Sequence, residues 1–375
     1  MIRKRGNNEG SIHKRPNGTW RAQISIKGGR LGFTAKRRAE AQAWLMEIGN
    51  QVDRGLTLKA ARLAFNDFLD EWLKTVKARL TFESWRSYNQ VVHDYISPVL
   101  GSTKLRELTP LLIQRLYNGQ LDKGIGERTI QKTHAVIRAS LNSAKKMGLL
   151  THNPASATSP PKAKVREMQI LNEKQIRELL RTAKVSDGGR YALYYLAIVT
   201  GMRQGELLAL HWSEVDLAKG TLHVKYSLKR VPGEGLQPRK PKTTSSVRSI
   251  KIGLETCQVL HGQGSVVAEM KAKAGDDWHD LGYVFPASNG QPIEPAEAYR
   301  GLHKMLQRAG LTKIRFHDLR HTAASLMLNN GVDVLIASKR LGHAKPSITL
   351  DFYGHLLPNI QSQVADLLEA VVRGG

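Results

Sequence analysis

Near the start of the chain, apolar residues recur at every second position, which predicts a small antiparallel sheet. The dipeptide Asn17-Gly18 is a strong turn signal, and strict alternation of apolar and polar residues follows it. The apolar members are Trp20, Ala22, Ile24 and Ile26. A second turn at 27–30 and a short apolar run at 31–33 add a third strand. From Ala35 to Ile48 the spacing becomes helical, which predicts one helix that covers the sheet. Its apolar residues are Ala41, Trp44, Leu45 and Ile48.

Residues 60–150 have apolar side chains at helical spacing throughout, which predicts a helical domain. The first helix is amphipathic, with Leu63, Phe65, Phe68, Leu69 and Trp72 on one face. A second helix begins at Ser84 and is expected to stop at about Ser97, because Pro98 follows. A third helix begins with Thr109 as N-cap and Pro110 at its first position. A fourth runs from Arg128 to Met147 and ends at Gly148. The aromatic residues fit a packed core. Lys and Arg on the polar faces can bind phosphates without reading sequence.

The segment from Asn153 to Val165 is rich in Pro, Ala, Ser and Lys, and it predicts a linker that is extended at its Pro-Pro pair. Beyond it the pattern is mixed. Helices are expected from residue 172, at 191–200, and on residues 296–308 and 317–329. Strands are expected at 221–226 and 246–252, with a basic Pro/Gly-rich loop between them. An amphipathic tail follows to Val371. The predicted fold class is therefore multidomain, mainly α with small β-sheets, and α+β in its last part.

The composition favours a polyanionic partner. The chain of 375 residues carries a formal net charge of +25, and its basic residues recur in every section. Residues 1–55 alone contain twelve Lys or Arg against four Asp or Glu. A sheet with that charge could lay one face in a DNA groove, although a basic appendage without sequence preference is the simpler alternative. A single cysteine, Cys257, excludes an internal disulfide. The basic N-terminus and the lack of a long apolar run predict a soluble, cytoplasmic protein without membrane partners.

Basic side chains and a phenol come close together between residues 315 and 355. His317 and Arg320 are three positions apart on a predicted helix, so they share one face. His343 and Tyr353 follow, and Arg203 is available upstream. Arginine is the planar donor that fits two phosphate oxygens, and tyrosine can act as a covalent nucleophile. The pattern predicts a phosphate-binding site with a tyrosine nucleophile.

Five short motifs, in this order, resemble those of the tyrosine recombinases, and most of all the integrases of phages and conjugative elements. They are TGMRQGEL at 200–207, KTTSSVRSI at 242–250, HDLRHT at 317–322, LGH at 341–343, and Tyr353. Any one motif is weak, but five in order are specific. The resemblance covers nearly the whole chain. It implies an arm-type DNA-binding domain at 1–55, a helical SAM-like core-binding domain at 60–150, a linker at 151–167, and a catalytic domain with a C-terminal tail at 168–375.

The resemblance also implies a clamp for the reacting phosphate. Arg203 and Arg320 would grip the non-bridging oxygens, where negative charge develops during cleavage. His343 would donate a further hydrogen bond. His317 would act as a base or as an oxygen ligand.

The nucleophile implied by the resemblance is Tyr353, which would attack phosphorus and leave a 3′-phosphotyrosine. Its ordinary pKa of about 10 is expected to fall in a cationic site. Lys242, rather than the competing Lys240, would protonate the departing 5′-oxygen. No metal or cofactor is needed, and the phosphotyrosine retains the energy for religation. His321 and His355 receive no chemical role and are expected to make structural hydrogen bonds or phosphate contacts.

The implied function is site-specific recombination that integrates or excises a phage or mobile element. The implied partners are double-stranded DNA at core and arm attachment sites, a homotetramer on that DNA, and an excisionase or DNA-bending host factor. Three alternatives remain open. The i, i+4 pair His317 and His321 fits a metal-dependent hydrolase, but no HExxH motif or cysteine pair accompanies it. The others are a non-catalytic DNA-binding excision or regulatory protein, and a type IB topoisomerase.

Overall fold

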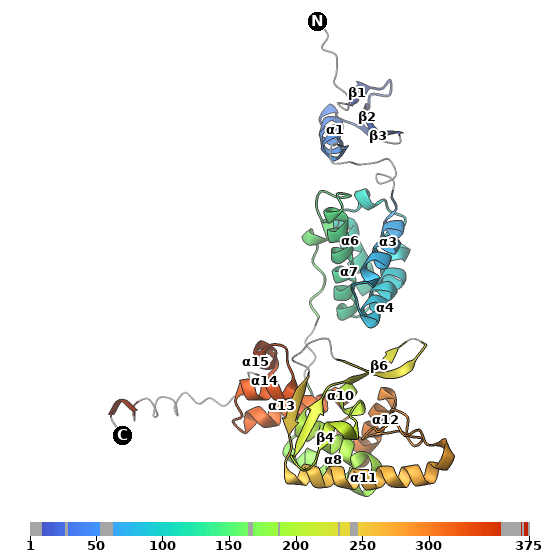
Figure 1. Ribbon diagram of the computed structural model, residues 1–375. Coiled ribbons are helices and arrows are strands. Elements are labelled where there is room, and N and C mark those ends of the chain that lie inside the picture. The colour runs from blue at the N-terminus through green and yellow to red at the C-terminus, as the bar shows by residue number, and fades with distance from the viewer. Residues whose placement is uncertain are drawn as a thin grey trace. The chain divides into compact units, whose positions relative to one another are not determined.

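The chain forms two compact units, residues 1–166 and 167–375 (Figure 1). The computed structural model describes residues 10–26, 29–52, 63–163, 168–186, 188–231, 233–240, 247–353, 369 and 371–373. Lys242, His355 and most of the predicted C-terminal tail lie outside the described residues.

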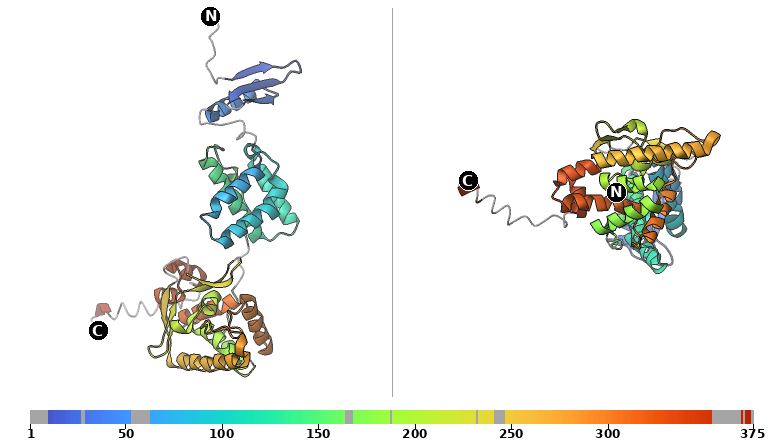
Figure 2. Two further views of the ribbon diagram at one scale, coloured as in Figure 1. Left: turned by 45° about the vertical axis from the view of Figure 1, so that its right-hand side comes forward. Right: turned by 90° about the horizontal axis from the view of Figure 1, so that it is seen from below.

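A three-stranded antiparallel sheet with one helix forms the start of the first unit, as the alternating pattern predicts. Its strands are β1 (Ser11–Lys14), β2 (Trp20–Ile26) and β3 (Gly29–Ala35), in the order β1-β2-β3. Gly18 has a φ of 82°, the left-handed conformation that the turn between β1 and β2 requires. Helix α1 (Arg38–Val52) lies along one face of the sheet (Figures 1 and 2). Ala22, Ile24, Ala41 and Ile48 are all buried between the two layers.

A bundle of helices forms the rest of this unit. They are α3 (Phe65–Lys77), α4 (Phe82–Val91), α5 (Ser97–Leu100), α6 (Pro110–Asp122) and α7 (Glu127–Lys146). The predicted caps are present, since the Thr109 hydroxyl accepts a hydrogen bond from the Leu112 amide and Pro110 opens α6. The bundle encloses a single cluster of buried apolar residues, whereas the predicted basic residues on its faces are exposed. The latter are Lys77, Arg79, Arg86, Lys132, Arg138, Lys145 and Lys146.

The chain does not leave the helix before Pro98, so that sequence expectation is wrong. After α4 the backbone makes a π-helical turn at Val92–Ile96 and enters α5 directly. Pro98 lies in the first turn of α5, a position that proline tolerates. Gly101 ends α5, and a Cβ there would lie 2.5 Å from the Ser97 carbonyl oxygen.

The beginning of the predicted linker is packed onto the helical bundle. Pro154–Ala157 forms a 3₁₀ turn in which Ala155 is fully buried. The Asn153 side chain caps this turn and also donates hydrogen bonds to α7, at the Arg138 carbonyl and the Asn142 side chain. Further along, Gln131 donates to the Pro161 carbonyl. An extended Pro-rich segment is therefore anchored here by side-chain amides.

The second unit combines helices with two small sheets. Its helices are α8 (Glu173–Ser186), α9 (Gly188–Thr200), α10 (Gln204–Leu208), α11 (Leu254–Ala274), α12 (Pro295–Arg308), α13 (Phe316–Asn329), α14 (Val334–Leu341) and α15 (Pro346–Tyr353). A sheet in the order β4-β5-β8 contains β4 (Val215–Asp216), β5 (Thr221–Val224) and β8 (Arg248–Lys251). Strands β6 (Ser227–Val231) and β7 (Gly235–Arg239) form a separate hairpin.

Two of these elements go beyond the sequence expectation. The β6–β7 hairpin replaces the predicted basic loop. The sequence of the hairpin gives a weak strand signal, because Pro238 lies within β7. The buried side chain of Leu228 holds the hairpin beside α10. Helix α11 runs along one side of the unit (Figures 1 and 2). Its buried residues are Thr256, Leu260 and Gln263, too few to give a continuous apolar stripe in the sequence.

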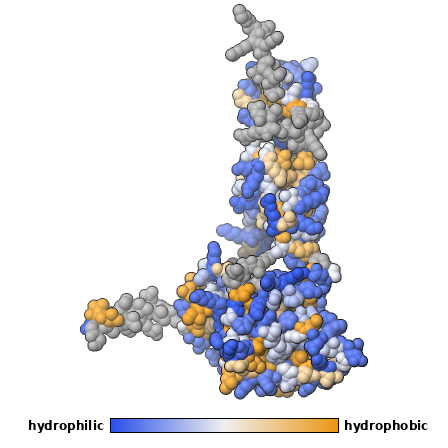
Figure 3. All heavy atoms as spheres, in the orientation of Figure 1, coloured by the Kyte–Doolittle hydropathy of each residue, from blue (hydrophilic) through white to orange (hydrophobic). Residues whose placement is uncertain are grey.

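The centre of the second unit is the packing of α13 against α9. Leu319 and Ala324 on α13 are fully buried, as is Tyr194 on α9. This contact places the end of α9, at Gly201, beside the first turns of α13. The face seen in Figure 3 is largely hydrophilic. Within the described part of the chain, no helix has both the length and the apolar character needed to cross a membrane.

Candidate active site

Arg203 is held by the carboxylate of Glu206, which lies three positions later in the chain. Helix α9 ends at Thr200, Gly201 follows with a φ of 63°, and Arg203 is the N-cap of α10. The Glu206 side chain accepts hydrogen bonds from the Arg203 amide at 3.0 Å and from its Nη1 at 2.8 Å. Arg203 Nη2 donates to the Gly342 carbonyl at 3.1 Å. The guanidinium is therefore held in place while 37% of the side chain stays exposed.

A second arginine, Arg248 on β8, shares the same carboxylate. Its Nη2 lies 2.9 Å from Glu206 Oε2, and its Nε donates to the Arg340 carbonyl at the end of α14. Although burial would raise the pKa of Glu206, the hydrogen bond from Arg248 and the charges of both arginines hold it below its ordinary value. The sequence expectation omitted Arg248. The signal was its place in the motif at 242–250, on an alternating strand.

Arg320 is the most enclosed cation of the site. It is 3% exposed, and its Nη1 donates to the Gly201 carbonyl at 2.8 Å. Its Nη2 is buried and has no hydrogen-bond partner among the described residues. Burial, with Arg203 second, lowers the pKa of Arg320 to about 9, which leaves the guanidinium charged at neutral pH.

The two predicted histidines are neutral at pH 7. Part of His317 is open to solvent, but desolvation by the surrounding protein, followed by the charges of His321, Arg320 and Arg203, lowers its pKa to about 4. The pKa of His343 is also lowered to about 4, by burial first and by Arg320 and Arg203 next. His343 Nδ1 is hydrogen-bonded at 2.8 Å to the hydroxyl of Thr349, which is fully buried on α15.

Tyr353 lies in an apolar cluster rather than in an open cationic pocket. It is 2% exposed and packs with Ala324, Leu328, Ala337 and Leu341. Its hydroxyl is hydrogen-bonded to His321 Nδ1. Burial raises the pKa of Tyr353 to about 12, and the nearby Arg320 offsets only part of that rise. The sequence expectation of a lowered pKa is therefore wrong for this structure, because desolvation of the phenolate outweighs the attraction of the cations.

Four of the six predicted residues are brought together by the fold. Arg203 precedes α10, His317 and Arg320 lie on α13, and His343 follows α14. The charges of the two arginines lower the pKa of both histidines. Tyr353 is close enough to Arg320 to feel its charge. Lys242 and His355 lie outside the described residues, whereas the competing Lys240 is exposed. Among the described residues, no three His, Cys, Asp or Glu side chains gather in a way that could hold a metal ion.

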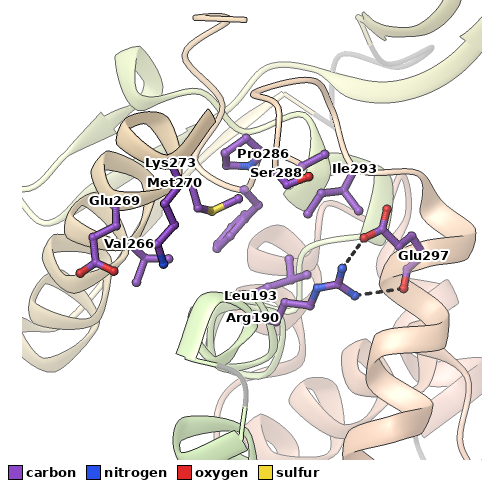
Figure 4. Close-up of a pocket in the computed structure, with 12 residues that line it drawn as sticks. Arg190, Leu193, Val266, Glu269, Met270, Lys273, Pro286, Ser288, Ile293 and Glu297 are labelled. Carbon is purple, nitrogen blue, oxygen red and sulfur yellow. Dashed lines mark hydrogen bonds and ion pairs between the residues drawn. The ribbon is translucent and has the colours of Figure 1, made fainter. Parts of the chain in front are cut away.

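A cavity of about 470 Å³ lies elsewhere in the second unit (Figure 4). Arg190 on α9 reaches across it and bonds to both the backbone carbonyl and the carboxylate of Glu297 on α12. Met270 and Lys273 of α11 line another side. None of the predicted site residues lines this cavity, so we assign it no part in the chemistry.

Comparison with known families decides the identity of the chain. Residues 169–359 match the Phage integrase family, and residues 64–121 match the N-terminal SAM-like domain of phage integrases. The first match alone covers more than half of the 375 residues. The chain belongs to the phage integrase family. The sequence predictions of a tyrosine recombinase, and of a site-specific recombinase of the integrase type, are thereby confirmed.

Relatives and solved structures agree with this membership in the phage integrase family. A XerC-like tyrosine recombinase of Caldanaerobacter subterraneus subsp. tengcongensis is 29% identical over 359 residues, 90% of this chain and 91% of the relative. The tyrosine recombinase XerC of Bacillus subtilis is 30% identical over 239 residues, 63% of this chain and 72% of that protein. The Tn1549 transposon integrase in complex with transposon right end DNA has a TM-score of 0.71 and 18% identity. That match covers 82% of this chain and 100% of the other.

A more distant solved structure extends over the N-terminal part as well. A lambda integrase dimer bound to a COC′ core site has a TM-score of 0.58 and 19% identity, over 94% of this chain and 96% of that one. These likenesses confirm the predicted fold class, which is mainly α with small sheets.

Proposed function

We propose that Arg320 and the cationic and imidazole side chains around it bind the phosphate of a DNA strand, and that Tyr353 attacks this phosphate to begin recombination. The observation that carries this proposal is the buried Nη2 of Arg320, which has no hydrogen-bond partner among the described residues. A buried donor without a partner costs free energy until one arrives. A phosphate oxygen is the partner that suits an arginine fork best, since two N–H groups can meet two oxygens.

The neighbouring groups support a clamp for negative charge. Arg203 keeps an exposed part while Glu206 and the Gly342 carbonyl hold its fork. The neutral ring of His343 carries one proton. If the Thr349 hydroxyl donates to Nδ1, that proton is on Nε2, and Nε2 can then donate to the phosphate. Fixed donors of this kind act most strongly on the charge that builds up in the transition state.

A bond forms between the Tyr353 oxygen and phosphorus, and the bond from phosphorus to the 5′-oxygen breaks. The phenol proton passes to a base, for which neutral His317 is suited. The departing 5′-oxygen receives a proton, and we assign that role to Lys242. Attack of a different 5′-hydroxyl on the 3′-phosphotyrosine reverses the step and exchanges strands.

A nicked suicide duplex carrying an attachment site of the element tests the chemistry. Wild type should form a covalent protein–DNA complex that gel electrophoresis detects, and Tyr353→Phe should form none. Tyr299→Phe, a half-buried tyrosine on α12 of the same unit, is the matched control. A complex that persists in Tyr353→Phe would show that another residue is the nucleophile.

The same duplex tests the clamp. Arg320→Ala should slow cleavage by about 10²–10³-fold, the range seen when a preorganised donor is removed. Arg300→Ala, which removes an exposed guanidinium from α12, should change the rate little. Cleavage by Arg320→Ala at nearly the wild-type rate would contradict the proposed clamp.

We further propose that the chain works on DNA as a homotetramer. A lambda integrase tetramer bound to a Holliday junction has a TM-score of 0.58 with this chain, which supports the assembly by analogy of fold. Leu335 and Ile336 on α14 are 53% and 60% exposed and offer apolar surface for a contact between protomers. Light scattering on the protein–DNA complex should give four copies per junction, and a one-to-one complex would exclude the tetramer.

We assign arm-site binding to the N-terminal sheet, because polar residues occupy the face of β2 and β3 away from α1. Arg21, Gln23 and Thr34 lie there, and Arg21 Nη1 donates to the Thr34 hydroxyl. Arg21→Ala should weaken binding to an arm duplex and leave binding to a core duplex unchanged. Unchanged binding to both duplexes would contradict the assignment. We place the reaction in the cytoplasm, with an excisionase or a DNA-bending host factor as the further partner to test in a recombination assay.

A further inference from the structure

His321 and Tyr353 are in direct contact inside the second unit. The Tyr353 hydroxyl is hydrogen-bonded to His321 Nδ1, and their ring centroids lie 5.7 Å apart. The tyrosine ring is 2% exposed among aliphatic side chains of α13 and α14. A phosphodiester, which is charged and bulky, cannot approach a phenol in that position. Tyr353 must therefore leave this place before it can attack DNA.

The same helix makes a second bond of this kind. Thr349 and Tyr353 are four positions apart on α15, so they lie on one face. Thr349 is fully buried and bonds to His343, while Tyr353 bonds to His321. Helix α15 is thus docked through two histidines, one in the phosphate clamp and one outside it. A movement of α15 that frees Tyr353 also acts on the contact that orients His343.

Both partners of the Tyr353 bond are held in their neutral forms. Burial raises the pKa of Tyr353, and burial lowers the pKa of His321. The charge of Asp318 opposes the fall at His321, whereas the charges of Arg315 and Arg320 add to it. Proton transfer from the phenol to His321 would place an anion in an apolar cluster, which burial disfavours. The contact therefore holds the phenol in its protonated form against a neutral imidazole.

We propose that His321 is a positioning residue that holds Tyr353 in a buried resting place, and that this bond must break before strand cleavage. The inference rests on the proposed role of Tyr353 as nucleophile. It assigns His321 to the control of that step, so that the phenol is exposed when α15 shifts on DNA. The resting bond limits attack by an unassembled protein.

Chemical access to Tyr353 in the DNA-free, full-length chain tests the proposal directly. The rate of nitration by tetranitromethane is followed by mass spectrometry of the peptide that contains Tyr353. His321→Leu, which keeps bulk and removes the bond, should raise that rate about two- to tenfold, the range expected for losing one net hydrogen bond. His321→Asn places an amide near the position of Nδ1 and should restore a rate close to wild type.

The helical bundle supplies a matched control. Tyr117 is also fully buried, its hydroxyl lies 3.0 Å from His134 Nδ1, and burial raises its pKa to about 12. His134→Leu should therefore raise nitration of Tyr117 and leave that of Tyr353 unchanged. Equal nitration of Tyr353 in wild type and His321→Leu would overturn the proposal. Circular dichroism checks that each variant is folded, and His321→Gln, whose amide extends past the Nδ1 position, replaces the leucine variant if that one does not fold.

Single-turnover cleavage of the suicide duplex separates a resting contact from a catalytic one. If His321 holds the tyrosine back, His321→Leu should cleave at least as fast as wild type. If His321 were the base, cleavage would fall by about 10²-fold or more, and the asparagine variant would not restore it. Tyr353→Phe distinguishes failure of the proposed function from failure of the role proposed for His321. A covalent complex formed by Tyr353→Phe would contradict Tyr353 as the nucleophile. If Tyr353→Phe forms no complex but His321→Leu cleaves slowly, only the role of His321 is contradicted.

Discussion

Arg248 Nη2 lies 2.9 Å from Glu206 Oε2, and both side chains are more than nine-tenths buried. Arg203 donates to the other oxygen of the same carboxylate, so one buried anion orients two arginines of the site. The Nε of Arg248 in turn holds the Arg340 carbonyl, at the end of the helix that leads to His343. The position of the clamp thus depends on an ion pair that is not itself expected to touch DNA.

Removing Arg248 should therefore destabilise the fold and disturb the site together. We expect Arg248→Met to lower the free energy of unfolding by about 3–5 kcal/mol, because it leaves the carboxylate of Glu206 buried with one partner fewer. Chemical unfolding followed by circular dichroism measures the loss. Arg239→Met removes the exposed ion pair with Glu234 and should cost less than about 1 kcal/mol. A similar loss in both variants would contradict a special role for the buried pair.

A side chain at Gly342 should cost stability and also disturb the site. Its φ of 69° is the left-handed conformation, and a Cβ there would lie 2.9 Å from Arg248 Nη1. We expect Gly342→Ala to cost about 1–2 kcal/mol in backbone strain and to slow cleavage further by displacing His343. Gly310 has a φ of 67° with open space around its Cβ position, so Gly310→Ala should show the strain without the loss of cleavage. Equal cleavage by both variants would show that Gly342 matters only for backbone conformation.

Thr349 should act on catalysis more than on stability. Thr349→Val keeps the shape of the fully buried side chain and removes the hydroxyl bonded to His343 Nδ1. We expect the free energy of unfolding to change by about 1 kcal/mol or less, while cleavage of the suicide duplex slows by about tenfold or more. Thr182→Val, which removes a hydroxyl bonded to Glu178 in the same unit, is the control and should leave the cleavage rate unchanged. Normal cleavage by Thr349→Val would show that His343 needs no such support.

The histidines of the site should make the protein less stable in mild acid. The pKa values of His317 and His343 fall from 6.5 to about 4 on folding, so between these pH values the unfolded chain binds more protons. Their contribution to stability is fully present above pH 6.5 and is lost as the pH falls toward 4. Urea unfolding of wild type and His343→Gln at about pH 7.5 and about pH 5 measures it, and wild type should lose more stability on acidification than the variant.

The pH experiment has a control on the surface of α11. His261→Gln removes an exposed imidazole and should leave the pH dependence of wild type in place. Parallel loss of stability in wild type and His343→Gln would mean that the histidine is not held neutral by its surroundings.

The sequence by itself determined most of the elements and nearly all of the residues that we assign to chemistry. Local rules were enough for the turn at Gly18, the cap at Thr109 and the helix that carries His317 and Arg320. Each depends on residues a few positions apart, and the motifs add which side chains belong together. The same local rules failed at Pro98, where a π-helical turn delivers the chain into a new helix, and at α11, which lacks a continuous apolar stripe.

Only the tertiary structure decided how these residues act on one another. No spacing in the sequence joins Arg248 to Glu206 or the Arg320 guanidinium to the Gly201 carbonyl. The first contact joins β8 to α10, and the second joins α13 to the end of α9. The state of Tyr353 is the clearest case. Its neighbours in sequence indicate a phenol activated by cations, whereas the fold buries it against aliphatic side chains and His321, where desolvation raises its pKa. Burial is a property of the packed chain, so the sequence predicts which tyrosine is the nucleophile, and only the fold sets the surroundings of that side chain.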